Sequence, residues 1–245
     1  SNMKTFAEKD GNDFIVNGTK NWVTSGQNSD LIIFFCVTDR SAGSRGISAF
    51  IIEKGTPGFT VGKKENKLGL RASDTCELYF DNCKISKENL IGDEGQGFSI
   101  AMKALGGGRI GIAAQSIGLA RSALEKSLSY SKEREQFGQP IGNFGAIQNK
   151  IADMATNING ARLLVWQAAT LKDQGKDHAK ESSMAKLFAS STAMSAASDC
   201  VQIHGGYGYM QEYGVERLMR DAKITEIYEG TSEIQRLVIS RELLE

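Results

Sequence analysis

The sequence changes character once, between residues 88 and 96, and this change restricts the possible folds more than any other feature. After it, apolar residues recur at helical spacing with few helix-breaking residues. Before it, short apolar runs are separated by turn signals, which predicts β-strands at residues 13–16, 19–24, 31–37, 47–52, 59–62 and 75–85. We therefore predict an α+β multidomain chain. A small β-barrel or sandwich module, residues 1–92, is followed by an up-down four-helix bundle, residues 93–245.

Two details of the β module are predicted more closely. Asn17-Gly18 is the strongest short hairpin signal, so we expect a tight turn there between the first two strands. Residues 31–37 form a continuous apolar run, LIIFFCV, which predicts a strand buried on both faces.

The longest periodic pattern lies in a helix predicted over residues 144–171. Its apolar side chains step by three or four positions, which indicates one buried stripe of a bundle helix. The stripe comprises Phe144, Ile147, Ile151, Met154, Ile158, Ala161 and Val165. A further helix at 180–203 is rich in Ala and Ser, and its larger anchors are expected to be Met184, Phe188 and Met194. Shorter helices are predicted at 215–220 and 234–244.

The first predicted helix, residues 98–132, contains three consecutive glycines at 106–108. Each costs a helix roughly 1 kcal/mol relative to alanine. Two explanations stay open: close packing or a kink of the helix, or a ligand that lies against the bare backbone.

Composition excludes several classes of function. Twenty-nine basic residues balance 29 acidic ones, and nucleic-acid binding would need a basic surface. Four scattered cysteines, without paired spacing, indicate reduced thiols in a reducing compartment. No metal site is expected, because His178 and His204 have no clustered partners; His178 is expected to be solvated.

No apolar run is long enough to cross a membrane, and no signal peptide is recognised. Ser1-Asn2 resembles the remnant of an expression tag.

The strongest candidate for chemistry is a carboxylate on a turn near the C-terminus. Glu229 directly precedes Gly230, and a glycine allows a ligand to approach the backbone. Thr231 suits a helix N-cap, and Glu233 suits the first turn that follows. A capped surface turn with solvated acids is the plain alternative.

Residues 220–235, RDAKITEIYEGTSEIQ, resemble the C-terminal signature of the acyl-CoA dehydrogenases, most closely the short-chain, butyryl-type branch. The resemblance implies that Glu229 is the base that removes the α-proton of an acyl-CoA thioester. The isovaleryl type carries its base near the position of Gly108 instead. Further implied substrate-binding residues are Gly106, Gly108, Arg109, Tyr228 and Gly230, and Thr231, Ser232 and Glu233 are implied to bind the cofactor.

Three other motifs resemble the same family and imply FAD. NWVTSG at 21–26 matches the flavin-facing strand and implies contacts from Trp22, Val23 and Thr24; on its own, this motif is more often core packing. REQFG at 134–138 and QIHGGYG at 202–208 match segments that reach the FAD of a partner subunit, which implies roles for Arg134, Phe137, Gln202, Gly205 and Gly206. His204 within the last motif is expected to be structural.

The implied reaction is FAD-dependent α,β-dehydrogenation of a short-chain acyl-CoA to a trans-2-enoyl-CoA, as in fatty-acid β-oxidation. An electron-transferring flavoprotein is the implied electron acceptor, and a homotetramer built as a dimer of dimers is the implied assembly. The expected location is the bacterial cytoplasm, with the mitochondrial matrix as the alternative. Two positions depart from the family pattern: Gly106, where an acid contacts the pantetheine of CoA, and Gly145, where a glutamine contacts the adenine.

The family's N-terminal helical domain does not occur in this sequence, so we expect the chain to correspond to the C-terminal two-thirds of a family member. Two alternatives remain open: a non-catalytic, oligomerising fragment without FAD, and an acyl-CoA oxidase or flavin monooxygenase on the same fold. A visible absorption spectrum distinguishes the first alternative from a flavoenzyme, and oxygen consumption with acyl-CoA distinguishes the second.

Overall fold

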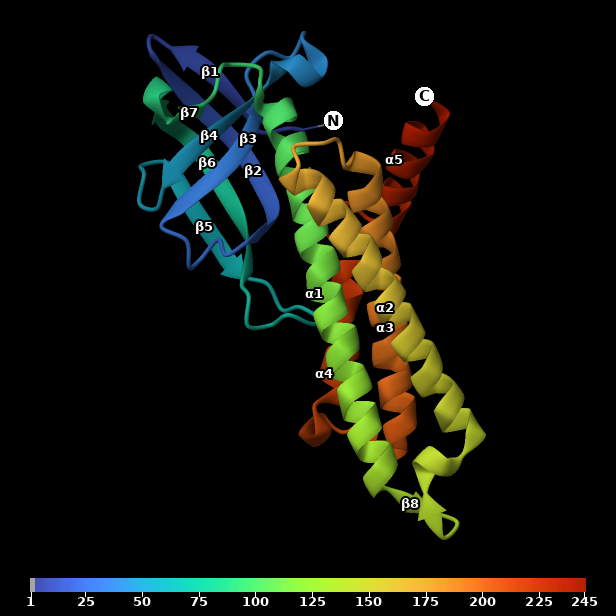
Figure 1. The fold of residues 1–245 in the computed structure, drawn as a ribbon. Helices are drawn as coiled ribbons and strands as arrows, with labels where there is room; N and C mark the ends of the chain where they lie inside the picture. Colours follow the sequence, from blue (N-terminus) through green and yellow to red (C-terminus); the bar gives the residue numbers. More distant parts are fainter. Residues whose placement is uncertain (1–2) are drawn as a thin grey trace. The chain divides into compact units, whose positions relative to one another are not determined.

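The computed structural model describes residues 3–245, and the chain divides into two compact units (Figure 1). The β unit contains the residues up to Lys67 together with Arg71–Ala104, and the helical unit contains Leu68–Leu70 and Leu105–Glu245. The predicted limit at 92/93 lies in the turn between the strand that ends at Ile91 and the helix that begins at Gly97.

The β unit is built on one seven-stranded sheet in the order β5-β6-β2-β1-β3-β4-β7. Phe34 of β3 and Phe80 of β6 are separated by two strands in that order, yet their ring centroids are 4.6 Å apart. The sheet therefore curls around one apolar core, as the prediction of a small barrel requires. Its strands are β1 (Phe6–Asp10), β2 (Asp13–Thr24), β3 (Leu31–Val37), β4 (Ile47–Glu53), β5 (Phe59–Lys64), β6 (Thr75–Ser86) and β7 (Leu90–Ile91).

The predicted hairpin at Asn17-Gly18 is wrong, because β2 runs through both residues as one strand. The tight turn lies instead between β1 and β2, whose pairing ends at Asp10 and Asp13. At Gly18 the register with β6 shifts, and a Cβ there would lie only 2.7 Å from the Cα of Thr5. The glycine thus permits a bulge and a close backbone approach, which in a strand produce the same sequence signal as a turn.

The prediction that residues 31–37 are buried on both faces is also wrong. Ile32, Phe34 and Cys36 are buried in the core, whereas Leu31 and Ile33 are each 60% exposed. Side chains alternate between the two faces of a strand, and the core covers only one of them. A continuous apolar run does not show which face is covered.

The helical unit contains α1 (Gly97–Glu133, from Leu105 onward), α2 (Gly145–Asp173), α3 (Ala179–His204), α4 (Val215–Thr225) and α5 (Ser232–Leu244). The three long helices run alongside one another in Figure 1, and a short hairpin of β8 (Glu135–Gln136) and β9 (Gln139–Pro140) connects α1 to α2. The predicted stripe of α2 is confirmed, because its later members are buried and its first three, Phe144, Ile147 and Ile151, pack against the core cluster that contains Met154 and Ile158. Ala161 and Val165 are buried in a second cluster.

Helix α3 buries mostly small residues, and its large buried residues are Lys186, Ile203 and His204 rather than the predicted Met184 and Phe188. Alanine and serine fill its packed face, and Met184 and Phe188 are more than one-third exposed, so their prediction as core anchors is wrong. Phe188 instead lies over Gly160 of α2, at 3.4 Å from the position of an added Cβ. Small side chains on much of the packed face allow the neighbouring helices to approach closely, in agreement with the exposure of Met184 and Phe188.

A three-residue segment, Leu68–Leu70, packs on α4 within the helical unit. The Leu70 amide donates to the Asp221 carboxylate at 2.6 Å, and Arg220 donates to the Leu68 carbonyl oxygen at 3.0 Å. Gly69 between them is so close that an added Cβ would lie 2.3 Å from the Arg220 carbonyl oxygen.

Within residues 3–245 no helix is both long and apolar enough to span a bilayer. Over the same residues, no group of three or more His, Cys, Asp or Glu side chains is arranged to hold a metal ion. The four cysteines are buried free thiols.

Candidate active site

Glu229 lies on the turn that connects α4 to α5, and its backbone is in the left-handed region, at a φ of +55°. Gly230 follows at a φ of +90°. A side chain other than glycine is uncommon in this region and persists there only when its surroundings determine the conformation. Thr231 caps α5 by accepting a hydrogen bond from the Ile234 amide, as the sequence predicts.

The carboxylate of Glu229 lies directly on the bare backbone of Gly108 in α1. A Cβ added to Gly108 would be 2.7 Å from Oε2 and 3.1 Å from Cδ of Glu229. Any larger residue at 108 would displace the carboxylate. The absence of a side chain at position 108 therefore makes room for the Glu229 carboxylate.

The two preceding glycines also meet side chains from elsewhere in the helical unit. The imidazole of His178 lies 3.2 Å from an added Cβ at Gly106, and the ammonium of Lys172 lies 3.0 Å from one at Gly107. These contacts favour close packing as the reason for the triple glycine. They also correct the expectation that His178 is solvated, because it is half-buried against α1.

Arg109 follows the triple glycine and is almost fully buried. Its Nη1 donates to the Ser183 hydroxyl oxygen at 3.2 Å, while its Nε has no hydrogen-bond partner among residues 3–245. Burial lowers the pKa of Arg109, and the negative charge of Glu229 opposes that effect. A buried guanidinium N–H without a partner is a donor available to a ligand.

Tyr228 precedes the candidate base and is held in place by the opposite helix. Its hydroxyl donates to Oε1 of Gln115 in α1, and burial raises its pKa. Five predicted substrate-binding residues thus belong to two short segments, 106–109 of α1 and 228–230 of the turn, and Glu229 on Gly108 directly connects them.

Sequence reasoning missed two polar residues beneath this turn. Lys186 of α3 and Gln235 of α5 are completely buried. The Lys186 ammonium donates to the Gly230 carbonyl oxygen at 2.8 Å, and Gln235 Nε2 donates to the same oxygen at 2.9 Å. A signal for Lys186 was present, because it falls at helical spacing between Ser182 and Ala189 on the buried face of α3.

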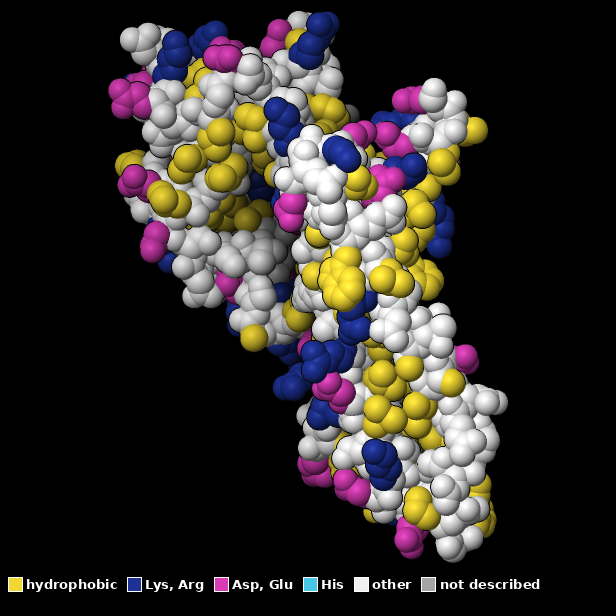
Figure 2. Space-filling model, viewed as in Figure 1, with side chains coloured by type: hydrophobic (Ala, Val, Ile, Leu, Met, Phe, Trp, Pro, Cys, Tyr) yellow, Lys and Arg dark blue, Asp and Glu magenta, His cyan; other side chains and the backbone are white. Residues whose placement is uncertain are grey.

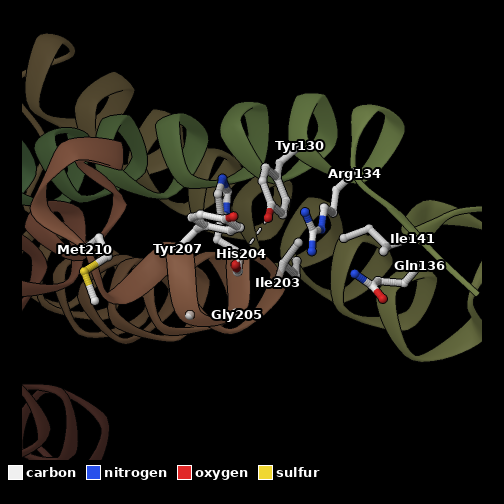
Figure 3. A pocket seen from close by; sticks show the side chains of 10 residues that line it. Tyr130, Arg134, Gln136, Ile141, Ile203, His204, Gly205, Tyr207 and Met210 are labelled. Carbon is white, nitrogen blue, oxygen red and sulfur yellow. Dashed lines mark hydrogen bonds between the residues drawn. The ribbon is translucent and has the colours of Figure 1, made fainter.

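A cavity of about 510 Å³ lies at a second place in the helical unit, where the two glycine-containing motifs meet (Figure 3). Arg134, Gly205 and Gly206, all predicted to bind the cofactor, line it together. The Arg134 guanidinium lies 5.5 Å from the centroid of the Tyr207 ring. An added Cβ at either glycine would meet no atom within 4 Å, so the backbone there is open to a ligand.

His204 forms part of the wall of this cavity, and its surroundings indicate a structural role. Its ring stacks on Tyr130 with centroids 4.1 Å apart, and Nδ1 is 2.8 Å from the Cys200 carbonyl oxygen. Burial lowers its pKa. Figure 3 shows Gln136 and Met210 at opposite ends of the cavity, with the aromatic residues between them.

The remaining predicted cofactor residues of the helical unit lie outside the residues that line this cavity. Phe137 is 92% exposed at the tip of the β8–β9 hairpin, and Gln202 is exposed on α3. Thr231 caps α5 instead, and Ser232 and Glu233 begin its first turn, where the backbone N–H of Glu233 and the Thr231 hydroxyl lower the pKa of Glu233.

In the β unit, Trp22 lies at a bulge and is presented outward. The register between β2 and β6 shifts between Lys20 and Val23, Trp22 has a φ of +60°, and its side chain is 71% exposed. Core packing is therefore excluded for Trp22. Val23 packs partly against the core, and Thr24 is exposed at the end of the strand.

Two family models together match almost the whole chain. Residues 1–83 match the middle domain of acyl-CoA dehydrogenases, and residues 95–244 match the C-terminal domain. The chain is 56% identical, over 242 residues, to an acyl-CoA dehydrogenase of Bacillus subtilis; the match covers 99% of this chain and 64% of that protein. It is 51% identical over 244 residues to the acryloyl-CoA reductase (NADH) of Anaerotignum propionicum, covering 99% of this chain and 62% of that protein.

The fold agrees with that of a solved relative. The structure of butyryl-CoA dehydrogenase from Megasphaera elsdenii matches with a TM-score of 0.97 at 50% identity, covering 99% of this chain and 64% of that one. The chain thus spans less than two-thirds of the length of these relatives. Its sequence, its two units and their order all agree with the resemblance drawn from the motifs. The chain belongs to the acyl-CoA dehydrogenase family.

Proposed function

We propose that this chain forms the middle and C-terminal parts of an FAD-dependent dehydrogenase that converts a short-chain acyl-CoA to a trans-2-enoyl-CoA. The observation that carries the proposal is the Glu229 carboxylate, held in a left-handed turn on the bare backbone of Gly108. The bare backbone at 108 makes room for the carboxylate, and an added Cβ there would push it away, as expected of a group that has to meet a reacting atom accurately.

Glu229 is proposed to remove the α-proton of the thioester. The α-C–H bond is weakly acidic, so a base has to be positioned within hydrogen-bond reach of the proton, and the developing enolate oxygen needs hydrogen-bond donors. The turn offers the backbone N–H of Glu229 as one donor. The buried, unpartnered Nε of Arg109 adds positive charge close to the same turn.

The cavity at Arg134 fits the phosphate-bearing end of FAD. An arginine suits a pyrophosphate because its planar, permanently charged group can form two parallel hydrogen bonds. The open backbone of Gly205 and Gly206 allows phosphate oxygens to approach, and Tyr207 supplies an aromatic surface for a flat ring. Trp22 and Thr24 of the β unit are proposed to face the flavin. The chemistry that FAD supplies when bound is acceptance of the β-hydrogen as a hydride.

The test of the base is Glu229→Gln in the full-length gene product carrying FAD, with Glu125→Gln as the control, since Glu125 is an exposed acid on the same bundle. After anaerobic mixing with butyryl-CoA, the rate at which the flavin absorbance disappears measures reduction of the flavin. We expect a loss of about 10²- to 10⁴-fold in the rate for Glu229→Gln, the range found for proton-transfer groups, and no change for the control. Near-normal bleaching by Glu229→Gln would remove the base assignment.

The cofactor site has a test of its own. Arg134→Ala is expected to lower the ratio of FAD to protein after purification, because a phosphate loses its charged partner. The control is Arg162→Ala on α2, which should leave that ratio unchanged, because this guanidinium donates to Asn159 of its own helix. Equal FAD content in both variants would exclude Arg134 from the site.

A reductive direction is the second candidate, and the relative named acryloyl-CoA reductase favours it. The same geometry serves both directions, because Glu229 would return the α-proton to an enoyl thioester. NADH oxidation with acryloyl-CoA, measured beside butyryl-CoA oxidation in the same preparation, distinguishes the two.

The assembly and the electron acceptor are part of the proposal. Leu163 and Trp166 expose more than half of their side chains on α2, and Figure 2 shows apolar side chains gathered along that face of the helical unit. An exposed apolar face of this kind is typical of an interaction surface, which supports self-association, and the assembly that we propose is a homotetramer. Light scattering measures the mass, and a reduction assay with an electron-transferring flavoprotein tests the acceptor.

A further inference from the structure

Two buried donors converge on a single backbone oxygen directly after the candidate base. Lys186 Nζ lies 2.8 Å and Gln235 Nε2 lies 2.9 Å from the Gly230 carbonyl oxygen. Gln235 also donates to the Glu229 carbonyl oxygen at 3.2 Å. Both side chains have no exposed surface, so the turn is held from below by groups that water does not reach.

Stability alone does not explain an ammonium at this position. A buried charge is costly unless it is paired, and replacing one by an apolar residue of similar volume is often neutral or stabilising. Among residues 3–245, the hydrogen bond to Gly230 is the only one that the Lys186 ammonium makes. The benefit of this lysine therefore has to lie in what the bond does to the turn.

The charges around Lys186 come from each neighbouring element. Burial lowers its pKa to about 8, and Arg109 of α1 acts in the same direction. The carboxylates of Glu226, Glu229 and Glu233, from the end of α4, the turn and α5, oppose both effects. Lys186 is therefore close enough to Glu229 for the two charges to interact, and it also donates a hydrogen bond to the backbone of the next residue, Gly230.

We propose that Lys186 of α3 is a positioning residue, which keeps Glu229 in its left-handed conformation on Gly108 by holding the Gly230 carbonyl oxygen together with Gln235. The inference rests on the proposed role of Glu229 as the base. The hydrogen bond connects the buried face of α3 to a turn whose backbone is strained at Glu229. Without it, the turn can relax toward a more populated conformation and carry the carboxylate away from Gly108.

The main test is Lys186→Met in the full-length, FAD-loaded protein, with Ser190→Ala as the matched control. Ser190 lies one turn further along α3, is equally buried, and bonds only within its own helix. We expect kcat with butyryl-CoA to fall 10- to 100-fold for Lys186→Met, as displacements near 1 Å cause. KM should stay near that of the control, because Lys186 bonds to the Gly230 carbonyl oxygen rather than to a ligand. The melting temperature at pH 7 should not fall, because replacing a buried charge by an apolar residue of similar volume is often neutral or stabilising.

A double-mutant cycle separates positioning from general support of the fold. If Lys186 acts through Glu229, then Lys186→Met has no further effect on the residual rate of a Glu229→Gln protein. Lys186→Ala, which leaves room for a small amine, should regain activity with added propylamine in a saturable way.

Three results would overturn the inference: a kcat for Lys186→Met within twofold of the control, additive losses in the double variant, or a fall in kcat that only follows a loss of folded protein by circular dichroism. These outcomes differ from failure of the proposed function, which shows as normal activity of Glu229→Gln.

Discussion

Gly108→Ala is the substitution that examines the candidate site most directly. The added methyl group would lie 2.7 Å from Glu229 Oε2, and ordinary contacts begin near 3.4 Å. The carboxylate oxygen therefore has to move by about 0.7 Å. Because it is the far end of a flexible side chain, it can move without disturbing the helix, so the change displaces the base and leaves the fold intact.

Two opposite effects are expected from this variant. Alanine is favoured over glycine in a helix by about 1 kcal/mol, so the free energy of unfolding should stay the same or rise. Proton abstraction should slow by roughly 10- to 100-fold, since displacements approaching 1 Å at a reacting group have effects of that size. A less active but equally stable protein is the expected result.

The matched control is Gly111→Ala in the same helix, where an added Cβ meets no atom within 4 Å. It should gain the same stability and keep full activity. Release of deuterium from α-deuterated butyryl-CoA measures the proton step in both variants, and urea unfolding measures stability. Full activity of Gly108→Ala, or a rise in KM at unchanged kcat, would refute the reasoning, because the methyl group would then not act on the carboxylate.

Three further predictions concern stability. Burial lowers the pKa of Lys186 from 10.5 to about 8, so the unfolded chain binds more protons than the folded one between those pH values, and the contribution of Lys186 to stability rises with pH. Urea titrations at pH 7 and 10.5 measure the difference in the free energy of unfolding between wild type and Lys186→Met. This difference should change by up to about 3 kcal/mol between the two pH values, and a constant difference would contradict the prediction. Gly69→Ala should lower the melting temperature, because its Cβ would overlap the Arg220 carbonyl oxygen at 2.3 Å, and an unchanged value would show that residues 68–70 shift freely. Thr231→Ala should cost about 1 kcal/mol through loss of the cap to Ile234, whereas Thr231→Ser should cost little.

Long-period features were predictable because they depend on many residues at once. The stripe of α2 runs over seven side chains, so a single misplaced residue does not hide it. Predictions about individual strands were wrong where a single residue decided between a turn and a bulge. Gly18 permits a bulge rather than a turn because Thr5 lies against it, and Thr5 is distant enough in sequence that no local pattern shows the contact.

Motifs identified the residues of the candidate site without placing them. The signature around Glu229 and the triple glycine were both visible in the sequence. That one carboxylate lies on one particular glycine was not visible, because the contact joins residues 121 positions apart. Lys186 went unnoticed because a lysine is normally exposed, although its helical spacing from Ser182 and Ala189 placed it on the buried face of α3.

The sequence by itself determined the order of the two units, the helical periodicity and the family, because each of these depends on which residue types lie close together along the chain. Only the tertiary structure decided which face of β3 is covered, which turn joins β1 to β2, and which buried donors hold the Glu229 turn. The physical reason is that burial and strain depend on the neighbours that folding brings together, and those neighbours are distant along the chain.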